Sequence, residues 1–210
     1  MNTHELDTKT ALIQAAGELF AQHGLEGTSV RAIAEKASSN IAAVNYHFGS
    51  KENLYKETLL YVARYGETYP AVRFWKDETR LQTREGQIEA IRGIVAEKFR
   101  VIFAENTPSW FWPLMLRSLL DPSPSLAEVV QNVFKPEHDA ITQIVRHIKP
   151  EMDEATAHLW GFLLFGAVAI YVFARAPILM LLGRQDYSRE FLDSVSDFVS
   201  NALLASLDLR

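Results

Sequence analysis

The sequence predicts an all-α protein, and three observations support that prediction. Apolar residues recur at spacings of three and four along most of the 210 residues, which is the period of an amphipathic helix. Glycines and prolines fall between these segments, where helices end. No run shows the alternation of apolar and polar residues that is typical of a strand. We expect a three-helix N-terminal domain with a helix-turn-helix, followed by a larger helical domain.

The first two helices are expected within residues 7–37. Leu12, Ala16 and Phe20 form one apolar stripe, which fits a helix that begins at Asp7 and stops at Gly24. Thr28 or Ser29 then caps a second, shorter helix. The polar stretch at 38–40 ends it.

The third and fourth helices follow without a long loop. Residues 41–48 place Ile41, Val44 and Phe48 on one inner face. Gly49 ends this helix and Ser50 caps the next, which we expect to end at Pro70 because proline cannot continue a helix.

Long helical patterns return after residue 86, with a stripe between residues 88 and 102 and helices near 153–176 and 188–206. The stretch 159–174 contains no formal charge. A membrane-spanning helix needs about 20 apolar residues with suitable flanks. This stretch is shorter and follows an acidic segment, which favours a helix buried between a core and a partner subunit.

Composition restricts the class of protein. The net charge is −5 and there are no cysteines, so neither a strongly basic surface nor thiol chemistry is expected. The polar N-terminus lacks the apolar segment of a secretory signal, which favours a cytoplasmic location. Any nucleic-acid partner must be recognised by a few well-placed cations.

Small and polar residues gather on the outer face of the third helix. Two helices joined by a short turn, the second with such a face, form the arrangement that enters a DNA major groove. Tyr46 and His47 offer donors at its end, while Ser50 and Lys51 open the next helix, where backbone N–H groups favour an anion. Phosphate binding is one interpretation. Packing of the two rings, with a solvated Lys51, is another.

Three strings carry a family resemblance: AAGELFAQHG (15–24), GTSVRAIAEKA (27–37) and NYHFGSKENLY (45–55). With them, residues 9–62 resemble the DNA-binding domain of the TetR/AcrR family of bacterial transcriptional regulators. The stretch FWPLMLRSLLDPSPSL (111–126) resembles the ligand-binding half of a subgroup whose recognition helix also ends in Asn-Tyr-His-Phe.

The resemblance implies that some of these residues contact phosphates and that others contact bases. Phosphate contacts fall on Thr28, Tyr46, His47 and Lys51. Base contacts fall on Arg31, Asn40, Ala42 and Ala43. Asn45 departs from the aromatic residue that is commoner in the family. Arg31 becomes the main candidate for specificity because an arginine pairs bidentately with guanine. The predicted DNA-binding set is Thr28, Ser29, Arg31, Ser39, Asn40, Ala42, Ala43, Asn45, Tyr46, His47 and Lys51.

The resemblance also implies a ligand-released homodimeric repressor that binds double-stranded operator DNA. Residues 1–52 would form the DNA-binding domain, and residues 53–210 a domain for effector binding and dimerisation through the last two long helices. The alternative is a non-catalytic helical adaptor or a membrane-associated binding protein.

The effector is expected to be a small apolar or amphipathic molecule. Aromatic residues at helical spacing are more often core than ligand pocket, and a charge within an apolar run such as Arg175 needs a carboxylate or an acidic ligand as partner. The predicted ligand-binding residues are Trp110, Trp112, Met115, Arg117, His158, Phe162, Phe165 and Arg175.

An enzyme is not expected. The sequence has no glycine-rich phosphate loop, no HExxH and no GxSxG. The six histidines lack the spacing of a metal site, and His138 and His147 are expected on the surface. We therefore expect no catalytic residues, no cofactor and no metal.

Overall fold

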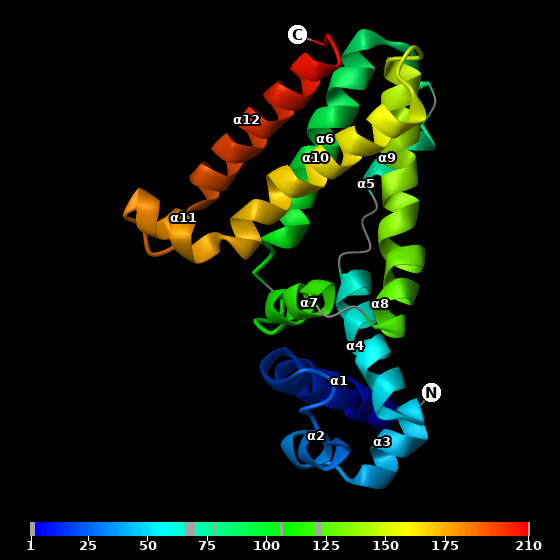
Figure 1. Ribbon diagram of the computed structural model, residues 1–210, viewed down its shortest axis with the longest axis vertical. Coiled ribbons are helices and arrows are strands. Elements are labelled where there is room, and N and C mark those ends of the chain that lie inside the picture. The colour runs from blue at the N-terminus through cyan, green and yellow to red at the C-terminus, as the bar shows by residue number, and fades with distance from the viewer. Residues whose placement is uncertain (1–2, 66–69, 78, 106, 121–122, 210) are drawn as a thin grey trace. The chain divides into compact units, whose positions relative to one another are not determined.

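The computed structural model describes residues 3–65, 70–77, 79–105, 107–120 and 123–209 (Figure 1). Helices form the regular structure throughout this part of the chain, and no strand occurs in it. The all-α prediction is therefore confirmed. The chain divides into two compact units, Met1–Glu67 with Asn106–Val133 and Thr68–Glu105 with Phe134–Arg210, which are described separately. The predicted domain boundary at residue 52 stays a prediction.

The first unit is built around its N-terminal helix, which packs against α2, α3, α4 and α7. Its helices are α1 (Thr3–His23), α2 (Val30–Lys36), α3 (Ile41–Phe48), α4 (Lys51–Tyr65), α7 (Phe111–Leu120) and α8 (Pro124–Val129). A π-helical turn, η2 (Val130–Phe134), follows α8 in the chain. The fully buried residues that hold the unit together include Leu12, Phe20, Ile33, Val44, Leu54, Leu59 and Leu114.

Short-range signals determine the helix ends of the first unit. Gly24 and Gly49 have φ angles of +73° and +75°, a left-handed backbone that glycine adopts without strain, and both end their helices as predicted. Ser29 caps α2 by accepting a hydrogen bond from the Ala32 N–H at 3.1 Å. The prediction that α1 begins at Asp7 is wrong, because the helix extends back to Thr3.

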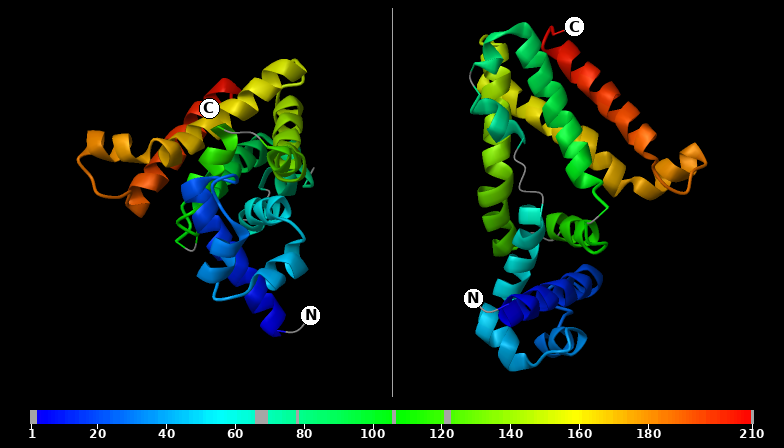
Figure 2. Two further views of the ribbon diagram at one scale, coloured as in Figure 1. Left: turned by 60° about the horizontal axis from the view of Figure 1, so that its bottom comes forward. Right: turned by 180° about the vertical axis from the view of Figure 1, so that it is seen from behind.

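The second unit contains α5 (Pro70–Trp75), η1 (Arg80–Gln82), α6 (Arg84–Ile102), α9 (Lys135–Ile148), α10 (Glu154–Phe173), α11 (Arg175–Leu182) and α12 (Arg189–Ser206). Figure 2 shows α12 running alongside α6, and α11 projecting from the junction of α10 and α12. Pro70 begins α5, since the first position of a helix needs no N–H partner. The last described residue of α4 is Tyr65, and because residues 66–69 lie outside the described chain, the predicted end of the fourth helix at Pro70 stays a prediction.

The predicted helix 153–176 is broken. It ends at Phe173 with Ala174 as its C-cap, and α11 starts at Arg175. Pro177 explains the break, because its ring would clash with the Phe173 carbonyl and it has no N–H to donate there. As the third residue of α11, Pro177 occupies a position where no intrahelical donor is required.

A buried ion pair joins three helices of the second unit. Glu137 on α9 is only 8% exposed. Its carboxylate accepts hydrogen bonds from the Ala71 N–H at 3.2 Å and pairs with Lys98 Nζ at 3.0 Å. The carboxylate therefore caps the start of α5 and ties it to α6 and α9, as a negative charge at a helix N-terminus should.

α10 has two different apolar faces. Ala157, Trp160, Leu164 and Val168 are buried in the core of the second unit, whereas the large apolar side chains on the opposite face are exposed. Among the described helices, α10 alone has the length and apolar composition to cross a membrane. A core helix whose second face is exposed has the same composition.

Candidate nucleic-acid interface and effector region

α2, a short turn and α3 form a helix-turn-helix in the first unit (Figure 1). Ser38 has a φ of +51°, which turns the chain between the helices. Asn40 caps α3 by accepting a hydrogen bond from the Ala43 N–H at 2.8 Å. That bond occupies the Asn40 side-chain oxygen and leaves its amide N–H₂ group for a base edge.

The outer face of α3 is open to solvent. Ala42 and Asn45 are exposed, Ala43 is partly buried and Tyr46 is 76% exposed. Packing is therefore the wrong interpretation for Tyr46. Its ring makes an edge-on contact with His47, with centroids 5.1 Å apart, and His47 is half-buried.

The sequence prediction placed Ile41 on the inner face of α3, and that is wrong. Ile41 is 46% exposed, while Val44 and Phe48 are buried. Ile41 is the first residue of α3, and the N-terminal residues of a recognition helix are those that meet base edges. An exposed isoleucine there can contact a thymine methyl group. The position of Ile41 directly after the N-cap Asn40 was the feature of the sequence that could have indicated its exposure.

Arg31 and Glu35 form an ion pair one turn apart on α2. Arg31 Nε donates to Glu35 Oε1 at 2.8 Å, and both side chains are well exposed. The hydrogen bond, followed by the charge of Glu35, raises the pKa of Arg31. Both terminal nitrogens of the guanidinium remain available, and they are the pair that reads guanine.

The N-terminus of α4 forms the second polar feature. Ser50 Oγ accepts a hydrogen bond from the Asn53 N–H at 3.1 Å, and Lys51 is the first helical residue. The pKa of Glu52 is lowered, first by its own backbone N–H and then by the Ser50 hydroxyl. This helix end therefore stabilises negative charge, which is the property that a phosphate contact requires.

Two other predicted contacts have more structural roles. Thr28 is only 4% exposed, and its hydroxyl donates to the Gly24 carbonyl oxygen at 2.7 Å. The Thr28 hydroxyl proton is therefore engaged inside the first unit, and the predicted phosphate contact of Thr28 stays a prediction. Ser39 is partly buried, and its N–H donates to Ala34 O at 2.8 Å.

The predicted effector residues of the first unit lie on or beside α7. Trp110 is 5% exposed, and its indole N–H donates to Gln14 Oε1 at 2.9 Å. Met115 is also buried, and Trp112 is half-buried. Arg117 donates to the carbonyl oxygens of Ala21 and Gln22 near the end of α1, at 3.3 and 3.2 Å. Trp110 and Arg117 thus stabilise the packing of α7 on α1.

The other predicted effector residues belong to the second unit. Phe162 and Phe165 are exposed on α10. Arg175 pairs with Asp186 at 2.5 Å and lies over the Tyr187 ring. Asp186 is thus an internal carboxylate partner of Arg175, one of the two kinds of partner that were expected. The pKa of Asp186 is lowered by the Tyr187 N–H and then by Arg175.

His138 and His158 form a pair that the sequence did not indicate. Their Nε2 and Nδ1 atoms lie 2.9 Å apart, joining α9 to α10. The predictions that His138 and His147 lie on the surface are wrong, because both are half-buried and His147 Nε2 lies 3.2 Å from Leu81 O. Burial, and then His158, lower the pKa of His138. No group of three or more His, Asp or Glu side chains in the described chain could hold a metal.

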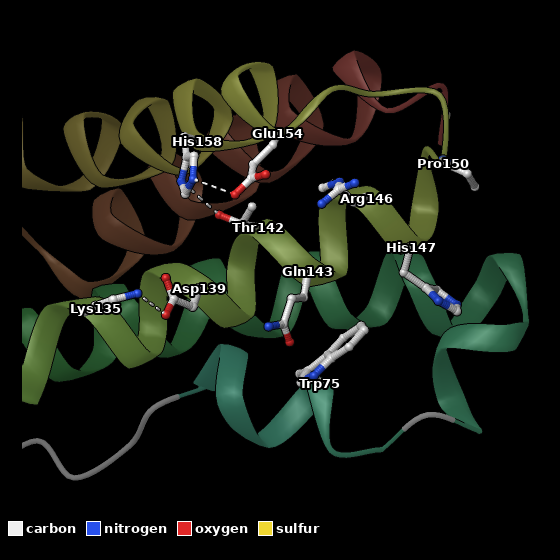
Figure 3. Close-up of a pocket in the computed structure, with 10 residues that line it drawn as sticks. All are labelled: Trp75, Lys135, Asp139, Thr142, Gln143, Arg146, His147, Pro150, Glu154 and His158. Carbon is white, nitrogen blue, oxygen red and sulfur yellow. Dashed lines mark hydrogen bonds and ion pairs between the residues drawn. The ribbon is translucent and has the colours of Figure 1, made fainter.

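A polar groove of about 620 Å³ lies on the second unit (Figure 3). Of the predicted effector residues, it contains only His158. Lys135 is already paired with Asp139 at 2.6 Å. The groove is lined by Trp75, Lys135, Asp139, Thr142, Gln143, Arg146, His147, Pro150, Glu154 and His158. Most of its walls are polar, and the predicted small apolar or amphipathic effector stays a prediction.

A helix-turn-helix with an open recognition helix, in a chain of helices alone over its described part, defines a DNA-binding transcriptional regulator. Residues 12–58 match the sequence profile of bacterial regulatory proteins of the tetR family. Residues 87–208, more than half of the chain, match the C-terminal domain of the HTH-type transcriptional dual regulator CecR. The chain belongs to the TetR family, as the sequence predicted.

Relatives and solved structures agree with this assignment. The chain is 25% identical over 201 residues to the HTH-type transcriptional dual regulator CecR of Shigella flexneri, covering 91% of this chain and 87% of that protein. It is 29% identical over 97 residues to the HTH-type transcriptional repressor AcnR of Corynebacterium glutamicum, covering 45% of this chain and 44% of that one.

Two solved structures share the fold. The TetR-family regulator PfmR of Thermus thermophilus has a TM-score of 0.61 at 23% identity, covering 90% of this chain and 92% of that one. A transcriptional regulator of a Rhodococcus species has the same TM-score and identity, covering 94% and 96%. The protein is a DNA-binding regulator of transcription, which is a non-enzymatic role.

Proposed function

We propose that the protein is a homodimeric repressor that leaves its operator when a small molecule binds. Residues 1–52 would read the DNA, and residues 53–210 would bind the effector and a second subunit. The exposed outer face of α3 beside the capped N-terminus of α4 is the observation that supports this proposal most directly.

The DNA contacts divide into two groups. Lys51 and the N-terminus of α4, with Ser29, Tyr46 and His47, would hold phosphates and set the position on the duplex. Bases would be read by residues of α2 and α3 and the turn between them. Exposure supports this role for Arg31, Asn40, Ile41, Ala42 and Asn45, whereas Ser39 and Ala43, the other two candidates, are partly buried. Alanines offer no hydrogen bond, so Arg31 would supply most of the discrimination.

A dimer is required by the small size of one helix-turn-helix head. Two heads about 34–36 Å apart on one face of the duplex bind far better than one. The exposed apolar face of α10 supports a partner subunit at the second unit. An obligatory second subunit also means that the operator should be palindromic.

Effector binding would act through the spacing of the heads. α4 carries Ser50 and Lys51 at its start, and its last described residue, Tyr65, is followed five positions later by Pro70 of α5. A small apolar or amphipathic ligand that moved α4 would move the phosphate contacts with it. The remaining predicted effector residues stay candidates, without Arg175, which Asp186 neutralises.

We also propose that the protein is soluble and cytoplasmic and does not contact a membrane, because its target is DNA. We propose repression rather than activation because the Corynebacterium glutamicum relative is named a transcriptional repressor. The helical-adaptor alternative is no longer needed once the family is known.

The first experiment is a fluorescence-anisotropy titration of the purified protein. DNA from just upstream of its own coding region is compared with scrambled DNA at two salt concentrations. We expect tight, salt-sensitive binding that prefers the upstream DNA. Equal and weak binding to both would require a selection of bound sequences from the whole genome, and an absence of selected sequences there would refute the DNA-reading assignment.

The effector mechanism has a separate test. Once a ligand is found, its affinity is measured with and without operator DNA. Linkage requires DNA to weaken ligand binding by the factor by which ligand weakens DNA binding. Equal ligand affinities in the two titrations would exclude ligand release.

A further inference from the structure

The polar groove of the second unit crosses the outer face of α9. Figure 3 shows Glu154 and His158 of α10 on one side of that helix and Trp75, the last residue of α5, on the other. The volume of about 620 Å³ is in the range of small-molecule sites. All of the lining residues belong to the second compact unit, so the packing of that unit alone determines the shape of the groove.

Most of the polar side chains that line the groove already have a partner within the protein. Lys135 pairs with Asp139 at 2.6 Å. The Thr142 hydroxyl donates to the His138 carbonyl oxygen at 3.0 Å, and His158 Nδ1 lies 2.9 Å from His138 Nε2. These side chains shape the groove, because a ligand could use them only by breaking an existing contact.

Arg146 is different, because no carboxylate in the described chain neutralises it. Arg146 and Gln143 are both exposed, and neither forms a hydrogen bond or an ion pair with a described residue. Among the arginines whose side chains the structure describes, all others except Arg189 have a hydrogen bond, an ion pair or a ring contact. Since residues three apart on a helix share a face, the guanidinium and the amide form one set of free donors.

Trp75 supplies an aromatic surface at the other side of the groove. Its side chain is half-buried and makes an edge-on contact with His147, with ring centroids 6.2 Å apart and planes at 75°. An edge-on contact covers at most one face of the indole. The rest of the ring can therefore pack against an aromatic ring of a ligand.

We propose that the groove binds an elongated aromatic monocarboxylate. The carboxylate accepts two hydrogen bonds from the planar fork of Arg146, with the Gln143 amide beside it, and the aromatic end packs against Trp75. Arg146 lies toward α10 and Trp75 on the opposite side of α9 (Figure 3), and a helix with its side chains is about 10 Å across. The ligand is therefore about 10 Å long. The site is separate from the DNA contacts and, except for His158, from the predicted effector residues.

Charge favours one carboxylate over a phosphate. Lys135 and Asp139 neutralise each other, so Arg146 and Glu154 are the remaining charges of the lining when its histidines are neutral. Glu154 is 72% exposed, with Oε1 3.8 Å from His158 Nε2. The one free cation balances a single negative charge. A phosphate dianion would bring a second, unbalanced charge into a groove that already contains a carboxylate.

A ligand-observed NMR titration of the full-length protein tests the site with biphenyl-4-carboxylate, which has the required length. We expect a dissociation constant on the order of 0.5 mM, which is typical of a ligand of this size. Biphenyl-4-carboxamide has the same shape without the charge and should bind about tenfold more weakly or worse. Benzoate should also bind about tenfold more weakly, because it is too short to reach Trp75 from Arg146.

Substitutions assign the binding to the groove. Arg146→Gln should weaken binding of biphenyl-4-carboxylate about tenfold or more, because the charged, bidentate contact is lost. The matched control is Arg189→Gln on α12, which removes another exposed arginine without a described partner, outside the groove, and should change nothing. Trp75→Phe, which keeps a ring in place, should weaken binding about threefold. Glu154→Gln should strengthen it about threefold, because a like charge about 7 Å from the ligand carboxylate is removed.

Several results would overturn the proposal. One is an Arg146→Gln protein that binds biphenyl-4-carboxylate as tightly as the native protein does, and another is a native protein that shows no binding at about 5 mM. Equal binding of the carboxamide would overturn the recognition of charge. Weaker binding by Glu154→Gln would overturn the monocarboxylate in favour of a zwitterion whose amine contacts Glu154.

Failure of this site and failure of the proposed function are distinguishable. A protein that binds operator DNA but no biphenyl-4-carboxylate refutes the site and leaves the proposed function standing. A protein that binds biphenyl-4-carboxylate through Arg146 but selects no DNA sequence refutes the proposed function and leaves the site standing.

Discussion

Removal of the Arg31 side chain should reduce sequence discrimination more than it reduces general DNA affinity. In the structure, Arg31 Nε is held by Glu35 Oε1 at 2.8 Å, which leaves both terminal nitrogens for one guanine. A bidentate contact of that kind discriminates against the wrong base by about 5- to 150-fold. The Arg31→Ala protein should therefore lose this 5- to 150-fold preference for the correct base at one base pair of the operator.

The assay is anisotropy with the operator and with variants of it that are substituted at one base pair at a time. Arg31→Lys is the matched control, because lysine keeps the charge but lacks the planar fork. Both variants should lose discrimination at the same position, and Arg31→Lys should keep the salt dependence of the native protein.

Removal of the Glu35 carboxylate should change DNA affinity in the opposite direction to removal of Arg31. Its carboxylate faces the same polyanion, so Glu35→Ala should raise affinity for all DNA by about twofold, the effect of one screened charge about 10 Å from a phosphate. Discrimination should fall by about twofold, because an exposed pair one turn apart orients Arg31 only modestly. An Arg31→Ala protein that keeps the full operator preference would refute this reasoning and move base reading to another residue.

Three further changes have separate readouts. Lys51→Ala should weaken binding to every sequence alike and reduce the salt slope by about 0.9, measured by titration at several salt concentrations. Glu137→Gln should lower the free energy of unfolding in urea by about 1–3 kcal/mol, because Lys98 loses a buried partner, while the exposed control Glu151→Gln should change it little. Burial lowers the pKa of His138, so its contribution to stability is complete above the ordinary pKa of about 6.5 and is lost as the pH falls toward the folded value. Unfolding in urea at pH 7.5 and 5.5 should show that loss, and His138→Gln should reduce it.

The helix-turn-helix was predictable because its determinants are local. Caps and turns depend on residues within about four positions of each other: Asn40 accepts from Ala43 and Ser29 accepts from Ala32. The same short range explains why Gly24 and Gly49 were recognised as helix ends. Ile41 was assigned wrongly because periodicity gives a helix face but not whether another helix covers it.

The effector region was less predictable for the same reason. Trp110 bonds to Gln14, 96 positions away, and His138 meets His158 across 20 positions. Aromatic and charged residues at helical spacing look alike whether they line a pocket or fill a core. Only their distant partners distinguish the two.

The all-α class, the N-terminal helix-turn-helix and the TetR family could be predicted from the residues alone, since periodicity, caps and short motifs are encoded within a few residues. Three features could be seen only in the folded chain: Arg175 pairs with Asp186, Thr28 is buried, and α10 keeps one face in the core and one in solvent. Burial and pairing depend on which helices pack together, and that packing follows from the whole chain rather than from any one segment.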